Sequence, residues 1–590
     1  MRGFGENSGL RVLVEVDGHK LNRPDMGSIN WTKIPIANIA YIEVIRGGQN
    51  VLYGNHALAG VIKITTKKGG DPKLYLRAVQ GDNHFEQYSA LATGGEGNWY
   101  ADAGVDYLRN EGFRDNALSW SKTGHASIGR HFSNGSLTLK ASTDETYTQL
   151  PGPLTRAEME KDPTQSSNLG DQEINSTNGL VTLLWEGDHD WGKTIFGAGY
   201  SFRDSRWSLS GIYARNQSQG FSLAPRIQFG AEENHIILGW DLFYDKLKHD
   251  QLTAPENGDV AAWAELERIT TGPYVFAQYE VLKNLTLSGG ARYEIARTKN
   301  KYVAYDFTNP NPPLIEILPG IFIPNPAYDP NDTVRSVNAT NSYRGTITKD
   351  GWAAETSLIW NPTDTLSFWI GYDLSYRYPV LDETASYQGY PLSDPLNEKL
   401  EPEQGHGFEI GMKYSDAHTT LSLTAFYSIL ENEIAYDNVQ NLNVNIGATE
   451  RLGAELEAGY AGKYAGIQAQ GSIVDARFTE GSNAGKTIPL VPWAHGTVSA
   501  WVEPVPQLRL TTHYTYVGSQ VEGGDFANEK DKLNDYGLFG ARLDIMPTEK
   551  VTFFIKADNL LEEEFVSTAY TGGYYPGAGR SVQFGISMEL

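Results

Sequence analysis

Charged residues stand within otherwise apolar segments of the sequence, and their types and spacing could do chemistry. Glu43 and Arg46 lie in IAYIEVIRGG, while Glu409 and Glu455 lie in FEIG and GAELE. Carboxylate and guanidinium groups that face one another across a polar interior form strong ion pairs. Ion pairing is therefore chemistry that these residue types could carry out, and a polar interior alone would also explain each carboxylate.

Catalytic motifs are absent from the sequence. It contains no nucleophile elbow, no HExxH and no GxxxxGK[ST], and its 12 histidines are scattered without metal-ligand spacing. Cysteine is absent, which excludes disulfides and thiolate metal sites. The formal net charge of -24 argues against nucleic acid, whose phosphates require a basic surface. We therefore expect neither an enzyme nor a protein with a cofactor or metal of its own.

Length and composition favour one large closed β-sheet. The chain has 590 residues, of which 12% are aromatic and 62 are Gly, and its mean hydropathy is -0.40. No stretch approaches the roughly 18 consecutive apolar residues that a membrane-spanning helix needs. A membrane protein of this composition must cross with strands, whose alternation hides the apolar half from any hydropathy average.

Period-two alternation recurs from about residue 85 to the C-terminus. In 235–245 one face is apolar, with Ile236, Leu238, Trp240, Leu242 and Tyr244, and the other carries Gly239, Asp241 and Asp245. The same pattern is found at 284–294, 366–378, 420–430, 508–516 and 581–590. Such strands, with Tyr or Trp near their ends, are typical of a membrane β-barrel wall. A soluble solenoid, propeller or sandwich fits less well, because its second face would also be apolar.

Ten short polar turns separate pairs of these segments. They lie at 95–97, 134–135, 187–192, 232–234, 282–284, 362–364, 416–418, 462–463, 504–507 and 547–549. With the first and last strands at the same end, the sequence predicts an all-β transmembrane barrel of 22 antiparallel strands, wide enough to need a plug. Longer connections alternate with the turns, and we interpret them as extracellular loops at 144–175, 298–350, 379–404 and 519–536.

Residues 11–66 differ from the rest, with short apolar segments separated by Gly-rich turns. The order VDG, IP, IEVIRGG, YG, ALAG and VIKITT over about fifty residues resembles the plug domain of TonB-dependent receptors. The resemblance continues at DNLL, at YPGAGR and in the last strand. Two residues depart from the family pattern: Gly48 stands where the family usually has Pro, and Leu590 stands where the chain usually ends on an aromatic residue.

The resemblance implies a bacterial outer-membrane transporter that acts as a monomer. Residues 1–70 would form the C-terminal part of an α+β plug, and residues 71–590 the barrel around it. The resemblance also implies that Arg46, in the same segment as Glu43, pairs with Glu409 and Glu455 and locks the plug to the wall. Alternation places both carboxylates on the lumen face.

Further segments are expected upstream of Met1. The sequence from Arg2 onward matches only the later part of the plug, so we expect a signal peptide, a TonB box and the first part of the plug to precede it. Through that box the family couples to a TonB-type energy complex of the inner membrane, which is the expected partner.

The expected ligand is a small ferric chelate, with iron present only as part of the cargo. The segment LPGPLT at 150–155 resembles the ferric-citrate-receptor-like branch of the family, although a Pro-Gly turn explains it equally well. An anionic chelate requires Arg donors, and the candidate contacts chosen by position are Tyr147, Gln149, Arg203, Arg206, Arg215 and Arg377. Two other hypotheses stay open: import of cobalamin, a quinone cofactor or another scarce nutrient, and a passive pore or surface-binding protein if the truncation is real.

Overall fold

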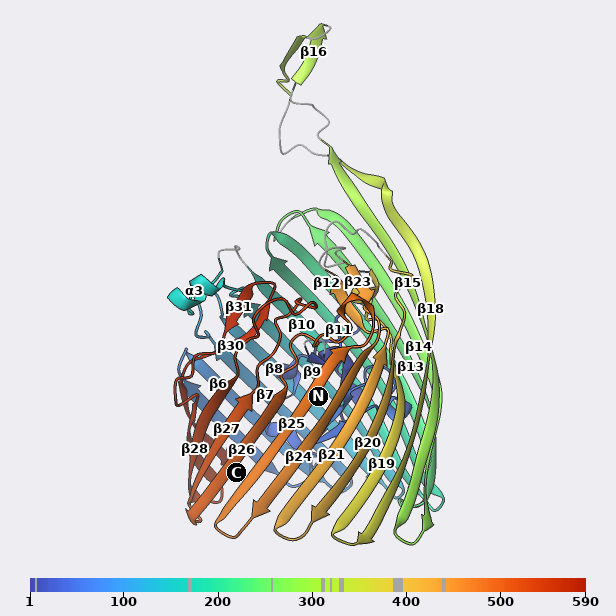
Figure 1. The fold of residues 1–590 in the computed structure, drawn as a ribbon, viewed down its shortest axis with the longest axis vertical. Coiled ribbons are helices and arrows are strands. Elements are labelled where there is room, and N and C mark those ends of the chain that lie inside the picture. The colour runs from blue at the N-terminus through green and yellow to red at the C-terminus, as the bar shows by residue number, and fades with distance from the viewer. Residues whose placement is uncertain are drawn as a thin grey trace.

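The structure is a closed barrel around a small N-terminal sheet (Figure 1). This computed structural model describes residues 1–5, 8–34, 36–167, 172–255, 258–308, 314–318, 321–327, 334–385, 396–437 and 442–590. Each of the 22 wall strands pairs antiparallel with the next, and the last closes on the first through pairs such as Phe584 with Gln80. The predicted strand number and antiparallel topology are confirmed.

The wall strands follow one another in chain order. They are β5 (Lys73–Gly81), β6 (Phe85–Glu96), β7 (Trp99–Asn110), β8 (Ser119–Phe132), β9 (Gly135–Gln149), β10 (Glu173–His189), β11 (Gly192–Leu209), β12 (Ile212–Gly230), β13 (His235–Leu252), β14 (Val260–Leu282), β15 (Leu285–Thr308), β18 (Val334–Thr363), β19 (Leu366–Arg377), β20 (Glu403–Ser415), β21 (Thr419–Glu431), β24 (Thr449–Ala461), β25 (Ala465–Phe478), β26 (Ala494–Val505), β27 (Leu508–Val517), β28 (Tyr536–Thr548), β29 (Val551–Asp558) and β32 (Ser581–Glu589). Each predicted short turn lies at the junction of two consecutive strands, and several overlap the strand ends by one to three residues.

The remaining elements are short. Three hairpins stand in longer connections: β16 (Leu314–Leu318) with β17 (Ile321–Pro324), β22 (Ile434–Asp437) with β23 (Leu442–Asn445), and β30 (Val566–Tyr570) with β31 (Gly573–Pro576). The helical turns are α1 (Ser8–Arg11), η2 (Trp31–Lys33), η3 (Ile36–Asn38), α2 (Asn50–Tyr53), α3 (Arg156–Lys161), α4 (Leu381–Ala385) and η4 (Gly481–Asn483). Among the described residues, no helix has the length and apolar character needed to cross a bilayer.

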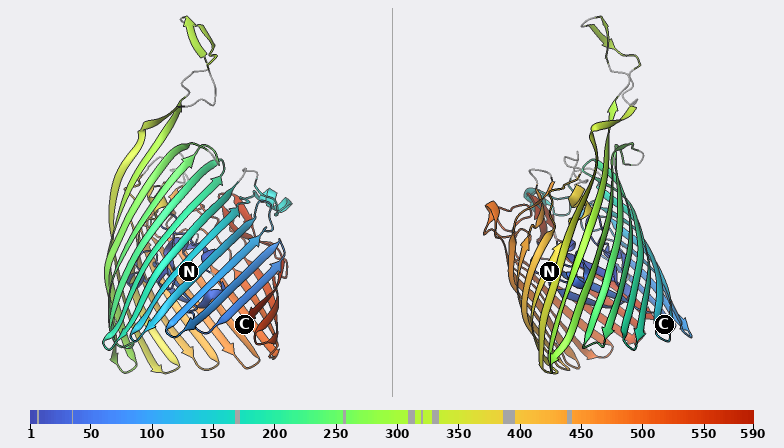
Figure 2. Two further views of the ribbon diagram at one scale, coloured as in Figure 1. Left: turned by 180° about the vertical axis from the view of Figure 1, so that it is seen from behind. Right: turned by 90° about the vertical axis from the view of Figure 1, so that its right-hand side faces the viewer.

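The wall is tallest on one flank, where β14, β15 and β18 have 23, 24 and 30 residues. Figures 1 and 2 show β15 and β18 continuing above the rest of the rim. The loop predicted at 298–350 is therefore wrong over much of its length, because β15 reaches Thr308 and β18 begins at Val334. Here the outward positions carry charges such as Lys299 and Lys301, so the apolar half of the alternation disappears while the strand continues.

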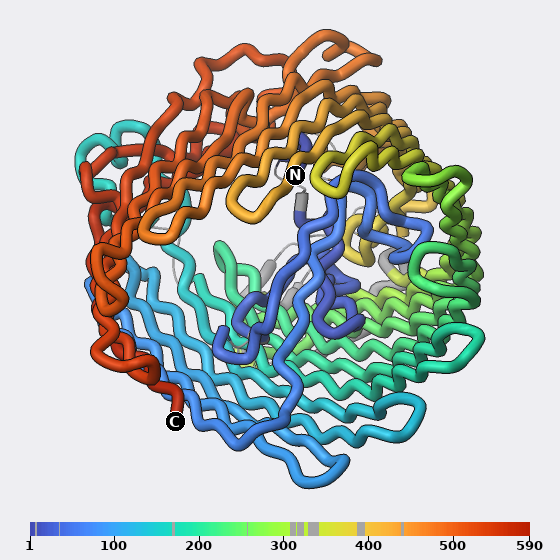
Figure 3. The backbone as a smooth tube through the Cα atoms, turned by 90° about the horizontal axis from the view of Figure 1, so that it is seen from below, coloured from blue at the N-terminus to red at the C-terminus, as the bar shows by residue number. Residues whose placement is uncertain are grey.

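The plug sheet lies inside the barrel, as the view from below shows (Figure 3). Its strand order is β2-β1-β4-β3, formed by β1 (Val12–Val16), β2 (His19–Lys20), β3 (Ile39–Arg46) and β4 (Gly60–Thr66). β1 runs parallel to β4, and β3 antiparallel to it. Leu13 and Val61 are fully buried and give this sheet a small apolar core of its own.

Gly48 lies where the plug approaches strand β19 of the wall. A Cβ at this position would occupy the space of the Asp373 and Ser375 side chains. The missing side chain therefore permits a close approach between plug and wall. This packing is a physical reason for glycine in place of the proline that is usual in the family.

Candidate functional site

Two arginines of the plug face two glutamates of the wall, and we call Arg2, Arg46, Glu409 and Glu455 the plug–wall quartet. Arg2 Nη2 lies 2.8 Å from Glu409 Oε2 and 3.3 Å from Glu455 Oε2. Arg46 Nε lies 3.7 Å from Glu455 Oε1. Glu455 thus bridges the two arginines, and the quartet ties the plug to β20 and β24.

The partners within this quartet differ in part from expectation. Arg46 does contact Glu455, but its shorter contact, 2.6 Å, joins its Nη2 to Glu457 Oε1. Glu409, expected to pair with Arg46, instead pairs with Arg2, whose guanidinium also lies 4.9 Å from the centre of the Phe426 ring. Sequence reasoning missed Arg2, although it directly precedes the Gly-Phe-Gly segment.

Glu43 has a partner inside the plug. The register of β3 on β4 sets Glu43 opposite Lys63, and Lys63 Nζ lies 3.2 Å from Glu43 Oε2. The expected contact of Glu43 with the wall is therefore replaced by an ion pair within the plug sheet.

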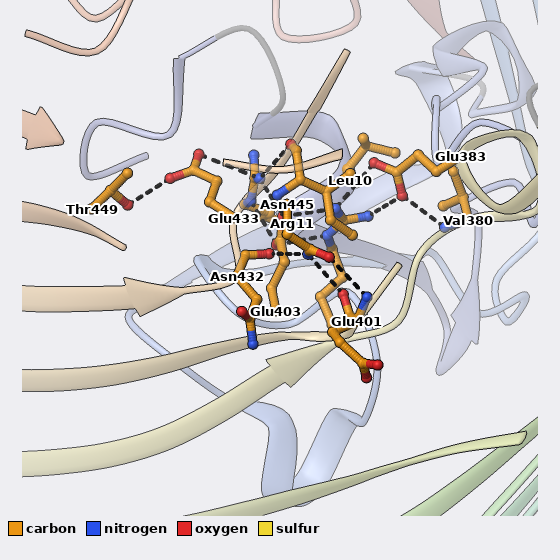
Figure 4. A network of polar contacts seen from close by, with 12 residues as sticks. Leu10, Arg11, Val380, Glu383, Glu401, Glu403, Asn432, Glu433, Asn445 and Thr449 are labelled. Carbon is orange, nitrogen blue, oxygen red and sulfur yellow. Dashed lines mark hydrogen bonds and ion pairs between the residues drawn. The ribbon is translucent and has the colours of Figure 1, made fainter. Parts of the chain in front are cut away.

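Six buried charges of alternating sign run between wall and plug (Figure 4). We call them the charge ladder, which is, in order, Glu383, Arg377, Glu403, Arg11, Glu433 and Arg451. None of these side chains is more than 7% exposed. Three guanidinium groups balance three carboxylates, so the ladder as a whole is neutral. Compensation of this kind is what buried charges require.

Glu403 is the central carboxylate of the ladder. Its Oε2 accepts from Arg377 Nε at 2.8 Å and from Arg11 Nε at 2.9 Å, while its Oε1 accepts from the Ile434 amide at 2.8 Å. Since Arg377 ends β19 and Glu403 begins β20, the ladder lies at the strand ends remote from the short turns. Arg11 therefore fixes the plug to the extracellular side of the wall.

The second half of the ladder closes around the first residues of the chain. Glu433 lies 3.4 Å from Arg11 and 2.8 Å from Arg451. The Phe4 ring lies near both guanidinium groups, and Arg451 Nε donates to the Gly3 carbonyl at 2.9 Å. The N-terminal segment is thus held by charge, by cation–π contacts and by a backbone hydrogen bond.

Arg377 was a candidate ligand contact, and the structure corrects this expectation. Its guanidinium is fully buried and donates to both Glu383 and Glu403. Alternation could have placed Glu403 and Arg451 on the lumen face, because they lie an even number of positions from Glu409 and Glu455. No signal in the sequence pairs them with Arg11.

Arg203 reaches the plug and not open solvent. Its Nη1 lies 3.2 Å from Asp25 Oδ2, and Asp25 also pairs with Arg23. Burial by itself would raise the pKa of the Asp25 carboxyl, but Arg23 and Arg203 outweigh it and hold that pKa below its usual value. We call Arg23, Asp25 and Arg203 the apical bridge. The Asp25 carbonyl also accepts a hydrogen bond from the Asp382 amide of α4, so the apical bridge joins the plug, the wall and an extracellular loop.

The other ligand candidates lie on the opposite face of the wall. Because Arg203 points inward, alternation turns Arg206 outward, and Arg215 and Tyr147 share its face through the strand register. Arg215 pairs with Asp204, and the Tyr147 hydroxyl donates to Glu173. These positions do not converge on the lumen with Arg203, which corrects the expectation of a common ligand site.

Gln149 and the LPGPLT segment belong to the packing of an extracellular loop. Gln149 Oε1 accepts from the Leu118 amide. Leu154 is almost fully buried and exchanges backbone hydrogen bonds with Tyr574 of β31. This segment braces the last extracellular hairpin.

A cavity remains between the plug and strands β10–β14 of the wall. Its volume is about 140 Å³, and Glu15, Lys63, Arg226 and Asp241 are among the charged residues that line it. Pockets that hold small-molecule ligands measure roughly 300–1,000 Å³. This cavity is therefore smaller than a site that would enclose such a ligand. Within the described ranges, no group of three or more His, Cys, Asp or Glu side chains is arranged to hold a metal ion.

Comparison with known proteins gives a consistent result. The family model "TonB-dependent Receptor Plug Domain" matches residues 1–61, and the model "TonB dependent receptor-like, beta-barrel" matches residues 65–560. The rhizobactin receptor of Rhizobium meliloti is 24% identical over 77% of this chain and 68% of its own length. The vitamin B12 transporter BtuB of Photobacterium profundum is 21% identical over 94% of this chain and 81% of its own.

Solved structures share the fold. The ferric yersiniabactin uptake receptor FyuA of Yersinia pestis gives a TM-score of 0.81 at 15% identity, covering 98% of this chain and 89% of its own. The ferric citrate transporter FecA in its unliganded form gives 0.80 at 15% identity, covering 100% and 90%.

Replacing Arg2 should loosen the plug more than replacing Arg46. Arg2 and Glu455 are about 10% exposed, so Arg2→Ala leaves Glu409 without its arginine and Glu455 with Arg46 alone, and it should cost about 3 kcal/mol. Arg46 is 33% exposed and should contribute about 1 kcal/mol or less. Hydrogen exchange of peptides from β3, with vancomycin sensitivity of cells as a second readout, measures the loosening. A larger effect of Arg46→Ala than of Arg2→Ala would contradict this ranking.

Removing the central charge of the ladder should be costly. Glu403→Gln leaves Arg11 and Arg377 with too few buried carboxylates, and we expect a loss of about 3–5 kcal/mol in the stability of the plug–wall contact. The measurement is hydrogen exchange of the peptide that contains Arg11 and β1. Glu401→Gln is the matched control, because Glu401 is 54% exposed and lies two residues away. Equal increases in hydrogen exchange in the two variants would show that burial of the carboxylate does not determine the loss of stability.

Proposed function

Because the chain belongs to the TonB-dependent receptor family of outer-membrane proteins, we propose that it is an energy-coupled importer of a small ferric chelate. The observation that carries the proposal is a plug bound to the inside of a closed barrel by the plug–wall quartet and the charge ladder. In this proposal the plug moves before the ligand passes, and separating its buried ion pairs requires work.

The energy source in this proposal is a TonB-type complex of the inner membrane. The family match supports it, because coupling to that complex defines the family. Force applied to the plug from the periplasmic side would be resisted at the ladder, on the extracellular side. Release of ladder contacts would then open the path past the plug.

The apical bridge suggests how an anionic chelate could favour that release. Arg23 is 21% exposed and Arg203 is 12% exposed, while Asp25 between them is 1% exposed. Carboxylates of a chelate can form bidentate contacts with the same guanidinium groups. A bound chelate would compete with Asp25 and weaken the contact between the plug, β11 and α4.

The relatives support an iron chelate as cargo and also supply the alternative. The ferric yersiniabactin uptake receptor and the ferric citrate transporter are named for ferric chelates, and a rhizobactin receptor is among the relatives. The vitamin B12 transporter matches 94% of this chain. Cobalamin is therefore the second candidate cargo, and it would not depend on competition for arginine.

Uptake of labelled cargo tests the proposal. Cells that express the protein from its own gene, and lack other ferric-chelate receptors, are given iron-55 citrate or cobalt-57 cobalamin. We expect saturable uptake of iron that a protonophore abolishes. Arg203→Gln should reduce the affinity for ferric citrate about tenfold or more, as expected for loss of a charge-assisted contact. Arg477→Gln, an exposed outward charge, is the control and should leave uptake unchanged.

Two other outcomes of the uptake experiment would favour a different function. Uptake of cobalamin alone would replace iron with the second candidate. Entry of both labels in the presence of the protonophore would indicate a passive pore and overturn the proposal.

A further inference from the structure

The tall flank of the barrel carries an unusual set of charges on its outer face. On β13 the outward residues are apolar from Ile236 to Tyr244, and the next two outward residues are Lys246 and Lys248. A lipid-facing band is about 25 Å tall and is flanked by aromatic side chains. The strand therefore continues past the aromatic level into the headgroup region, and its charges begin there.

The neighbouring strands change in the same way. On β15 the outward residues run from Leu285 to Ile295 and are followed by Arg297, Lys299 and Lys301. On β11 Phe202 is followed by Asp204 and Arg206. The register joins these residues across the sheet, since Lys246 stands opposite Glu267 and Glu267 opposite Lys299.

These charges are mainly positive. The outward cations on β11–β15 and β18 are Arg206, Arg215, Lys246, Lys248, Arg297, Lys299, Lys301 and Arg344, and the outward carboxylates are Asp204, Asp250, Glu265, Glu267 and Asp350. We call these thirteen residues the cationic outer patch. Eight cations against five carboxylates leave three positive charges on one face of a chain whose net charge is -24.

Other flanks show no such excess. At the corresponding level of β6–β10 the outward charges are Glu86, Arg109, Lys122, Glu145 and Glu173. On β24 and β25 they are Glu450, Asp475 and Arg477. Each of these sets carries more carboxylates than cations. The positive charge is thus specific to the tall flank.

Part of the patch is neutralised internally and part is free. Lys246 Nζ lies 2.9 Å from Glu265, and Lys301 Nζ lies 3.1 Å from the same carboxylate. Lys248 pairs with Asp250, and Arg215 with Asp204. Within the part of the chain that the structure describes, Arg206, Arg297, Lys299 and Arg344 form no ion pair.

We propose that the cationic outer patch binds the phosphorylated headgroups of an anionic lipid in the outer leaflet. The patch faces outward, next to the aromatic level, so its occupant must lie in the plane of the bilayer. Headgroup phosphates stand at that height, and Lys and Arg are the side chains that bind them. Bound lipid would compensate the excess positive charge and brace the long strands β14, β15 and β18.

The test compares lipid retention by native mass spectrometry. The whole protein in dodecyl maltoside is mixed with phosphatidic acid or with phosphatidylcholine of the same acyl chains. We expect wild-type protein to retain phosphatidic acid preferentially. Arg297→Gln/Lys299→Gln should weaken its binding roughly fivefold for each charge removed. Arg109→Gln/Lys122→Gln, which removes two outward cations from β7 and β8, should change it little.

The other occupants of the patch are distinguished by competition. Inorganic phosphate in excess, compared with chloride at equal ionic strength, should leave phosphatidic acid bound. Displacement by inorganic phosphate would mean that a free anion is the ligand, and displacement by dextran sulfate would mean a soluble polyanion. Either displacement, equal retention of the two lipids, or equal losses in the two variants would overturn the proposal. The result does not depend on which cargo the protein imports.

Discussion

Every backbone amide and carbonyl in a membrane-spanning wall must find its partner within the protein, because the hydrocarbon core offers none. Pairing of β32 with β5 meets this requirement by removing the last two free edges. Closure then dictates the rest. With 22 strands the lumen is too wide for wall side chains to fill, and alternation gives every strand one face toward lipid and one toward the lumen. In this protein a separate segment, the plug, lies in that lumen.

The plug and wall meet through small apolar clusters, such as Val51 against Tyr376, and through buried ion pairs, so their contact also depends on charge complementarity. Arg11 could not lie fully buried without Glu403 and Glu433, and those carboxylates in turn require Arg377 and Arg451. The charges are compensated only while the plug is seated. A seated plug is therefore stable, and one shifted by a few ångströms leaves several buried charges unpaired. The same ion pairs therefore stabilise the seated plug, and breaking them would free it to move.

Much of the fold follows from local sequence patterns. Period-two alternation and ten polar turns predict the strand number, and plug motifs place residues 11–66. The site does not follow in the same way, because its partners are distant: Arg11 and Glu403 are separated by 392 positions. Alternation shows that Glu403 faces inward but not which charge meets it. The choice of Arg2 over Arg46 as partner of Glu409 likewise depends on how the plug sits, and the extra length of β15 is hidden by its outward charges.

Arg203 and Arg206 show how one rule assigns two surroundings to similar residues. They are three positions apart on β11, and the odd spacing turns one toward Asp25 in the lumen and the other toward the outer face. The two residues are both arginines at a similar height on the strand, but the odd number of positions between them puts their side chains on opposite faces of the sheet. The same parity places a neutral ladder inside the wall and a cationic patch outside it. The contacts of a charged side chain in the wall are therefore set by two things. The first is the face of the strand that carries it, and the second is its height relative to the membrane.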